Sequence, residues 1–192
     1  MTTLPQPLGH LLTVAEYAEL GETESGYTEL VEGRLLMSPS PVPDHNVAAA
    51  ELLVRLRSQL PDNLEVILDV DGDLELVGPD QPGFSRRPDL AIIQRGARRR
   101  VRHAGGMLRA AEVLVVIEIV SPGSRRTDIV AKRSEYADAG IPNYWIVDLD
   151  EPVSLVDCHL AEGFGYQDGG SIIGVFTTTK PFPVRLQLDQ LL

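Results

Sequence analysis

A single carboxylate interrupts a strongly apolar segment of this chain. Residues 113–120 read VLVVIEIV, are rich in β-branched side chains, and are followed by Ser121-Pro122-Gly123. Such a run predicts a strand that is buried on both faces of a sheet. An unpaired carboxylate in that setting costs several kcal/mol or gives up its charge. We therefore expect a lysine, an arginine or a metal ion beside Glu118.

A second acid lies in a similar setting. Asp89 follows Arg87-Pro88 and directly precedes the apolar segment 90–93. Two carboxylates on neighbouring strands of a buried sheet favour a divalent metal, because Mg²⁺ is held by oxygen ligands and commonly by one or two carboxylates. The sequence therefore indicates a metal site built on Asp89 and Glu118.

Length and composition indicate one domain over 1–192 with its core at about 45–150. The chain has 192 residues, 43% of them hydrophobic, which suffices for one well-cored domain. No segment approaches the roughly 20 apolar residues of a membrane span, and the N-terminus lacks the pattern of a signal peptide. The single cysteine, Cys158, forms no intramolecular disulfide and no Cys/His metal cluster. We expect a cytoplasmic protein with no membrane partner.

Charge is distributed unevenly along the chain. The net charge of −11 argues at first against nucleic acid, because phosphate binding requires basic surface. Yet residues 86–133 hold 12 of the 17 Lys and Arg and only four acids, a local balance of +8. A basic segment thus surrounds the two carboxylates. The alternative is that the arginine-rich segment 95–102 is a merely solvated loop.

Local patterns predict the order of helices and strands. Thr13 to Glu16 is a capping-box pattern, and an apolar face of Val47, Ala50, Leu53, Val54 and Leu56 indicates a second helix capped by Asp44. Along the chain we expect a helix over 14–20, a hairpin over 28–37, a helix over 45–60, two strands over 64–71 and 73–77 joined at Asp71-Gly72, a strand after Asp89, the loop 95–102, the strand 113–120, a helix over 125–139, a strand over 144–148 and a β-meander over 153–188.

This order predicts an α/β (α+β) fold with a mixed central sheet flanked by helices, an appended N-terminal hairpin and a C-terminal β-meander.

Several short segments together resemble a known family. The order and spacing of these segments are similar to those of the Uma-two family, restriction-endonuclease-like proteins of the PD-(D/E)XK nuclease superfamily. The resemblance runs from about Leu12 to Leu192. The segments are 27–33, the Ser38-Pro39 connector followed by His45, 87–90, 116–122, 127–132, Glu135-Tyr136 and 140–148.

The resemblance implies a metal-dependent endonuclease that hydrolyses DNA and leaves 5′-phosphate and 3′-hydroxyl ends. Asp89, Glu118 and the backbone carbonyl of Ile119 would hold Mg²⁺ or Mn²⁺. Such a cation stabilises charge on the phosphate and lowers the pKa of a water. The superfamily also implies a homodimer that cuts two strands.

One position departs from the superfamily pattern. Its lysine normally stands two residues after the acid, on the same face of the strand, and here that place is Val120. The resemblance suggests that Lys132, on the following helix, takes over the role. Asp128, Lys132 and Tyr136 share a helix face at spacings of four. The alternative is an ordinary surface pair of Asp128 with Lys132.

The resemblance also suggests weaker candidates. Glu29 matches the position of a further acid, with Glu32 behind it, and His45 matches a helix-start position from which it could touch phosphate or water. Both hairpin acids and His45 are alternatively solvent-exposed side chains without a role. The arginines flanking the metal site are candidates for contacts with the DNA backbone: Arg86, Arg87, Arg125 and Arg126.

No phosphate-binding Gly-rich loop with Lys is present, so we expect no nucleotide cofactor. Two other functions stay open. One is a catalytically silent nucleic-acid-binding or scaffolding protein in which Lys132 or an arginine neutralises Glu118 as a structural ion pair. The other is a metal-dependent hydrolase of a smaller phosphoester.

Overall fold

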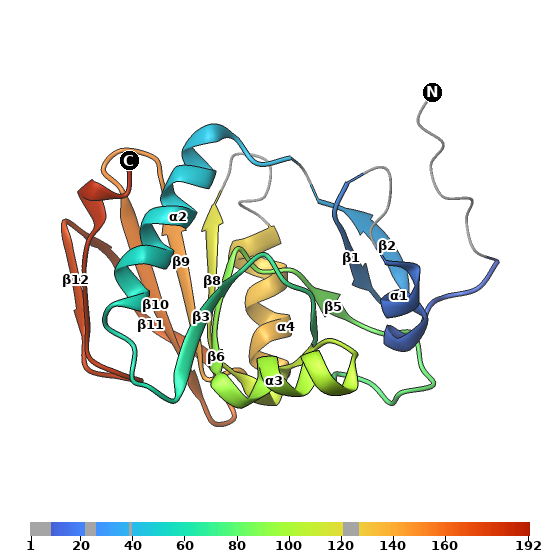
Figure 1. Cartoon of the computed structure of the whole chain (residues 1–192). Helices are drawn as coiled ribbons and strands as arrows, with labels where there is room; N and C mark the ends of the chain where they lie inside the picture. The colour runs from blue at the N-terminus through green and yellow to red at the C-terminus, as the bar shows by residue number, and fades with distance from the viewer. Residues whose placement is uncertain (1–8, 22–25, 39, 121–126) are drawn as a thin grey trace.

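A six-stranded mixed sheet forms the centre of the molecule (Figure 1). The computed structural model describes residues 9–21, 26–38, 40–120 and 127–192. Neighbouring strands run antiparallel except β8 and β9, which are parallel. In spatial order the strands are β11 (Gly165–Ile173), β10 (Ser154–Ala161), β9 (Asn143–Asp148), β8 (Val113–Val120), β6 (Leu90–Gln94) and β3 (Leu64–Leu68).

The apolar alternation of β8 divides the core into two layers. Val115, Ile117 and Ile119 pack toward helix α2 (Pro43–Arg57), while Val116 and Val120 pack on the opposite face. That opposite face is covered by the segment η2 (Thr127–Lys132) and helix α4 (Arg133–Asp138). Glu118 shares its face with Val116 and Val120, because side chains alternate along a strand. The predicted strand with both faces buried is confirmed.

A smaller sheet lies beside the central one and carries the N-terminal hairpin (Figure 1). The hairpin turns at Gly33, whose φ of 73° suits glycine. Helix α1 (Val14–Leu20) packs on this sheet through Tyr17 and Leu30 and has the predicted capping box. In spatial order the strands are β2 (Arg34–Met37), β1 (Thr28–Val31), β5 (Ser85–Arg86), β4 (Gly72–Asp73) and β7 (Leu108–Arg109), which is followed by η1 (Ala110–Glu112).

The C-terminal part continues and then leaves the central sheet. Strands β10 and β11 extend the sheet as an antiparallel pair, as predicted for the meander. The last two strands, β12 (Val175–Thr178) and β13 (Val184–Gln187), form a separate hairpin that ends in η3 (Leu188–Gln190). Phe176 and Leu186 pack this hairpin into the core layer beneath α2. The mixed α+β architecture is therefore confirmed.

Two segments differ from the sequence prediction. The strands over 64–71 and 73–77 do not form a hairpin, because β3 pairs with β6 whereas β4 pairs with β5 and β7. The arginine-rich segment is helix α3 (Arg95–Ala104), whose Ala97 and Val101 pack on Ala91 and Ile93. The prediction of a loop was wrong. It rested on the many charges of the segment, whereas Ala97 and Val101, at i and i+4, form an apolar helix face that packs on the sheet.

The second helix also differs in its start and its buried face. Helix α2 has Pro43 at its first position after Val42, so Asp44 lies inside the helix and does not cap it. Its buried residues are Ala48, Leu52 and Leu56, while Val54 is 66% exposed. Within the described ranges, no helix is long and apolar enough to cross a membrane.

Candidate active site

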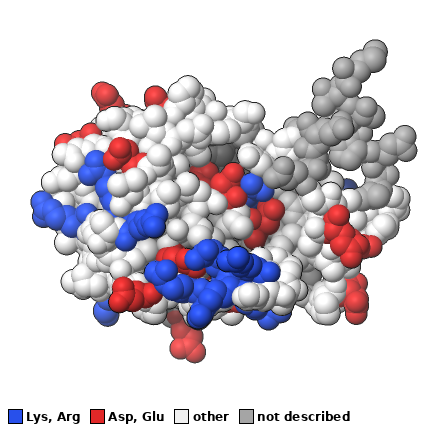
Figure 2. Space-filling view, in the orientation of Figure 1, with Lys and Arg blue, Asp and Glu red and all other residues white. Residues whose placement is uncertain are grey.

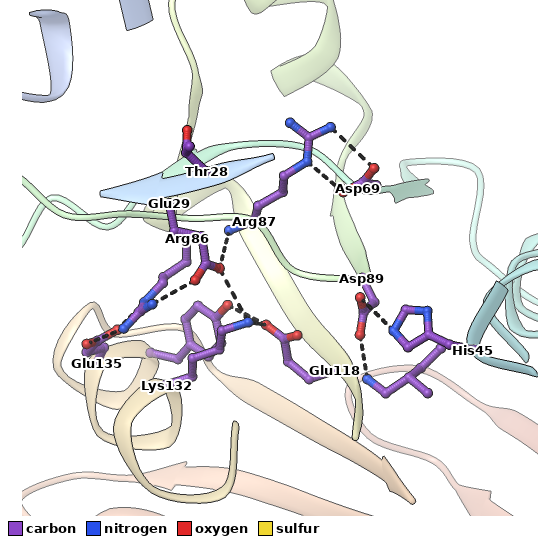
Figure 3. A network of polar contacts seen from close by, with 12 residues as sticks. Thr28, Glu29, His45, Asp69, Arg86, Arg87, Asp89, Glu118, Lys132 and Glu135 are labelled. Carbon is purple, nitrogen blue, oxygen red and sulfur yellow. Dashed lines mark hydrogen bonds and ion pairs between the residues drawn. The ribbon is translucent and has the colours of Figure 1, made fainter. Parts of the chain in front are cut away.

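Asp89 and Glu118 lie side by side on adjacent antiparallel strands. Leu90 of β6 pairs with Ile117 of β8, so Asp89, which directly precedes β6, lies at the same end of this strand pair as Glu118, and both acids line one cleft. The backbone N–H of Ile119 donates to Oδ2 of Asp89 over 2.6 Å (Figure 3). This bond fixes the Asp89 carboxylate at the edge of the strand pair.

Lys132 supplies the cationic partner that the buried Glu118 requires. Its Nζ lies 2.9 Å from Oε1 of Glu118, which is 2% exposed. Lys132 is the last residue of η2, a π-helical turn, and such turns are frequent at functional sites. Because Lys132 is only 7% exposed, it is a buried lysine and not a solvated surface residue. The side chain of Asp128 lies outside the described residues.

Tyr136 also contacts Glu118, from one helical turn beyond Lys132. Its hydroxyl donates to the same Oε1 over 2.8 Å. Burial raises the pKa of Tyr136 well above its ordinary value, and the charge of Glu118 raises it further. The phenol therefore stays protonated and acts as a permanent hydrogen-bond donor to the carboxylate.

Glu29, on β1 of the smaller sheet, holds Lys132 from the other side. Its Oε1 lies 3.3 Å from Lys132 Nζ and accepts the backbone N–H of Arg87 over 3.1 Å, while its Oε2 lies 2.8 Å from Arg86 Nη1 (Figure 3). Burial by itself would raise the pKa of Glu29, but Lys132 and Arg86 outweigh it and lower that pKa. Glu29 is therefore a buried and ionised carboxylate.

Replacing Glu29 with glutamine is expected to lower the melting temperature at neutral pH, by an amount that shrinks in acid. Because the folded-state pKa of Glu29 lies below its ordinary value of 4.5, its charge stabilises the fold above that pH. This contribution disappears as the pH falls through the folded-state pKa. Thermal melts of both proteins between about pH 3 and pH 7 measure the difference. A gap that stays constant with pH would show that the charge of Glu29 is not responsible.

Arg86 anchors this network and is itself buried. The guanidinium, 2% exposed, forms a bidentate pair with Glu135 of α4, with Nη2 2.7 Å from Oε1. Acid and base therefore alternate through the interior in the order Glu135, Arg86, Glu29, Lys132 and Glu118. The expectation that Arg86 contacts DNA phosphates does not suit this placement, because its donors face two carboxylates.

The other predicted arginines differ in their surroundings. Arg87 Nε lies 2.6 Å from Asp69 Oδ1, and its guanidinium stacks 3.9 Å above the ring centre of the exposed Tyr27. Its side chain is 15% exposed, so it reaches the surface at the edge of the site. Arg125 and Arg126 lie outside the described residues.

His45 approaches Asp89 from the first turn of α2. Its Nε2 lies 3.1 Å from Oδ1 of Asp89, with 15% of the side chain exposed (Figure 3). The helix start thus brings the histidine to the acid and not to open solvent. Glu32 lies apart from the network, exposed at the hairpin turn with a φ of 50°.

These side chains line one cleft between the two sheets. Its volume is about 540 Å³, and its walls include Asp89, Glu118, Lys132 and His45, together with Glu29. Figure 2 shows acidic side chains lying in a hollow at the centre of one face of the molecule. Three exposed apolar side chains line the cleft as well: Tyr27, Leu36 and Met37.

The donor set suits a hard divalent cation with few protein ligands. Among the described residues, no group of three or more His, Cys, Asp and Glu side chains is placed to hold a metal ion. Asp89 and Glu118 are a pair, and Mg²⁺ commonly takes one or two carboxylates together with water and substrate oxygens. A carboxylate offers about four acceptor positions, and Lys132 and Tyr136 both contact Oε1 of Glu118, so these two contacts do not by themselves exclude a cation. These residues fit Mg²⁺ or Mn²⁺ on chemical grounds.

Two members of the network were not among the predicted site residues. Tyr136 contacts Glu118, and Glu135 holds Arg86. The signal for Tyr136 was its spacing of four from Lys132, which places both side chains on one helix face. Glu135 lies in one of the segments that resemble the family, but nothing pointed to its partner Arg86, which is 49 residues away in the sequence.

Comparison with known proteins identifies the family. The model of the Uma2 family, described as putative restriction endonuclease, matches residues 14–168. A crystal structure of a putative nuclease of DUF820 from Anabaena variabilis is similar, with a TM-score of 0.70 at 19% identity, covering 94% of this chain and 97% of that chain. This likeness shows a shared fold. No curated protein matches the sequence. Since the family model spans most of the chain, this protein belongs to the Uma2 family.

Proposed function

We propose that this protein is a metal-dependent endonuclease that hydrolyses phosphodiester bonds of DNA. The observation that carries the proposal is the meeting of Asp89, Glu118 and Lys132 in one cleft of about 540 Å³. Paired carboxylates beside a lysine are the groups that phosphodiester hydrolysis with a divalent cation requires. The family description, restriction endonuclease, supports the same reaction class.

Asp89, Glu118 and the carbonyl of Ile119 would hold the cation. Bound Mg²⁺ or Mn²⁺ would stabilise negative charge on the phosphate and lower the pKa of a water molecule. The protein fixes the ligands in advance: the Ile119 N–H and His45 hold the two oxygens of Asp89, and Tyr136 donates to Glu118. Such prior positioning reduces the reorganisation needed when substrate binds.

Lys132 would act on the attacking water or on the developing phosphate charge. Its ammonium lies between Glu118 and Glu29, at 2.9 and 3.3 Å. Glu29 would therefore act as a positioning residue, since it keeps the ammonium of Lys132 at the cleft while Glu118 holds the cation. Arg86, by binding Glu29, is a positioning residue one contact further away.

Replacing Lys132 with methionine should lower single-turnover cleavage roughly 10²–10³-fold, the usual effect of removing one electrostatic donor. Metal affinity should be unchanged or higher, because the ammonium no longer competes for Glu118. Cleavage rates and Mn²⁺ titrations, both well below the melting temperature of the variant, separate the two effects. Lys132→Arg is the control, since it keeps the buried positive charge. Unchanged cleavage by Lys132→Met would remove the lysine from the mechanism.

The proposal is tested by incubating the protein with supercoiled plasmid and with single-stranded DNA, in Mg²⁺, Mn²⁺ or EDTA. Nicking or linearisation in the presence of metal and its absence in EDTA is the expected result. End-labelling of the products should find 5′-phosphates. Absence of cleavage with both metals on both substrates would contradict the proposal. The homodimer stays a prediction, which sedimentation equilibrium measures directly.

A second candidate is a catalytically silent nucleic-acid-binding protein. It is favoured by the direct contact of Lys132 with Glu118, which neutralises the acid without a cation. A silent site of this kind should bind no Mn²⁺ yet still bind DNA. Metal binding therefore discriminates between the two functions.

A further inference from the structure

Helix α3 presents a stripe of arginines that the proposed active site does not use. Its members are spaced at i, i+3, i+4 and i+7, so they share one face of the helix. All four are exposed: Arg95, Arg98, Arg99 and Arg102. The opposite face packs on the sheet through Ala97 and Val101. We call these four residues the arginine stripe.

The stripe is only partly neutralised by the protein itself. Arg98 pairs with Glu65 at 3.0 Å, and Arg95 donates to the backbone carbonyls of Asp62 and Leu64. Arg99 and Arg102 have no hydrogen bond or ion pair within the parts of the chain that the structure describes. These two exposed arginines therefore carry positive charge that no described acid of the protein neutralises through an ion pair.

This arrangement works against the stability of the helix. Like charges at i and i+4 repel one another, and cations near a helix N-terminus oppose the helix dipole. The segment 95–109 contains six arginines and no acid, in a chain whose net charge is −11. An anionic partner would relieve both effects, since it supplies negative charge to the N-terminal turn and to the stripe.

The stripe lies on the same face of the molecule as the acidic cleft. Figure 2 shows Lys and Arg side chains concentrated over α3, next to the hollow that holds the acids. Asp89 precedes β6 and Arg95 follows it, so about six residues of extended chain, roughly 20 Å, separate them. That length corresponds to about six base pairs at 3.4 Å each. Arg95 and Arg99 also line a groove of about 720 Å³ beside the helix.

We propose that the arginine stripe of α3 binds the phosphate backbone of duplex DNA whose scissile bond lies in the cleft. The inference rests on the proposed function, because it assigns the flanking duplex to the surface next to the active site. Arginine suits this role through its planar fork of donors, which binds phosphate oxygens in pairs. The contacts would position the duplex and carry no sequence preference.

The test is DNA binding by the Arg99→Gln/Arg102→Gln double variant, measured in EDTA so that no cleavage occurs. Fluorescence anisotropy with a duplex of about 20 base pairs, at several salt concentrations, gives both affinity and its salt dependence. Two lost phosphate contacts should reduce the slope of log K against log salt by about 2 and weaken binding roughly 10- to 60-fold at 0.1 M salt. The melting temperature should be unchanged or higher, because charge repulsion in α3 is relieved.

Arg185→Gln is the matched control, because Arg185 is an exposed arginine on β13. It removes one exposed arginine charge outside the stripe, half of the charge that the double variant removes, and should leave the slope within about 0.5 of the wild type. Equal slopes for the double variant and the wild type would overturn the inference, as would a wild-type protein that does not bind DNA or binds only anionic phospholipid vesicles. Cleavage in Mg²⁺ is measured separately. DNA binding that depends on the stripe, without any cleavage, would contradict the proposed nuclease activity but would still support the stripe as a DNA-binding surface.

Discussion

Replacing Arg86 with alanine is expected to lower the free energy of unfolding by about 3–5 kcal/mol, the range for removing one partner of a buried ion pair. The guanidinium is 2% exposed and neutralises both Glu29 and Glu135. Without it, two carboxylates are left partly desolvated, and Lys132 alone faces Glu29. Urea unfolding at neutral pH measures the loss of stability. At temperatures where the variant is partly unfolded, little or no productive binding of DNA is expected.

The control for this prediction is Arg98→Ala. Arg98 also pairs with a glutamate, Glu65, but its side chain is 58% exposed, so water replaces the lost contact and the cost should stay at or below about 1 kcal/mol. The contrast separates burial from the mere presence of an ion pair. Equal losses for the two variants would show that the buried network of Arg86 does not stabilise the fold.

Replacing Glu118 with glutamine should reduce single-turnover cleavage by about 10³-fold or more. Loss of a charged ligand removes several kcal/mol of stabilisation that a bound cation gives the transition state. Glutamine is nearly isosteric and keeps an acceptor oxygen for Tyr136, and Lys132 retains its contact with Glu29. Stability should therefore fall by only about 1–3 kcal/mol, so that the loss of cleavage can be measured on folded protein.

Glu112→Gln serves as the control for Glu118→Gln. Glu112, the last residue of η1, is held by Arg100 of α3 in a bidentate pair, and it does not line the cleft. Its replacement removes one acid in the same way and should leave cleavage within about twofold of the wild type. Cleavage retained by Glu118→Gln would contradict the assignment of this acid. Complete unfolding of that variant would instead favour a structural ion pair.

The positions of the two central acids followed from local sequence pattern. A carboxylate in the β-branched run 113–120 requires a partner wherever the strand packs, and Asp89 directly precedes the apolar run 90–93. The register of β6 against β8 then brings them together. A helix over 125–139 was also predicted, and the described part of it, residues 127–138, is helical. These features depend on residues that are close in the sequence or on one strand pair.

The features that the sequence did not predict depend on contacts between distant segments. Arg86 contacts Glu29 and Glu135, which are 57 and 49 residues away in the sequence. The residues next to Arg86 in the sequence therefore do not indicate whether its side chain is buried or lies exposed at the edge of the cleft. The turn at Asp71-Gly72 suggested a hairpin by local rules, yet β3 pairs with β6, and Leu64 packs in the same core layer as Leu90 and Ile92. Tertiary pairing thus overrode turn preference.

The proposed metal site is tested most directly by measuring Mn²⁺ binding to the wild type and to Asp89→Asn. Both proteins are saturated with duplex DNA, and the electron paramagnetic resonance signal of free Mn²⁺ reports how much metal is bound. Asparagine can still accept the Ile119 N–H, so a thermal melt should confirm that the variant is folded. The wild type should take up at least one Mn²⁺ per chain more than the variant, because Asp89 and Glu118 are proposed to hold the cation at the phosphate. Equal uptake by the two proteins would contradict a metal site in this cleft and would leave the pair of Lys132 and Glu118 as a structural ion pair.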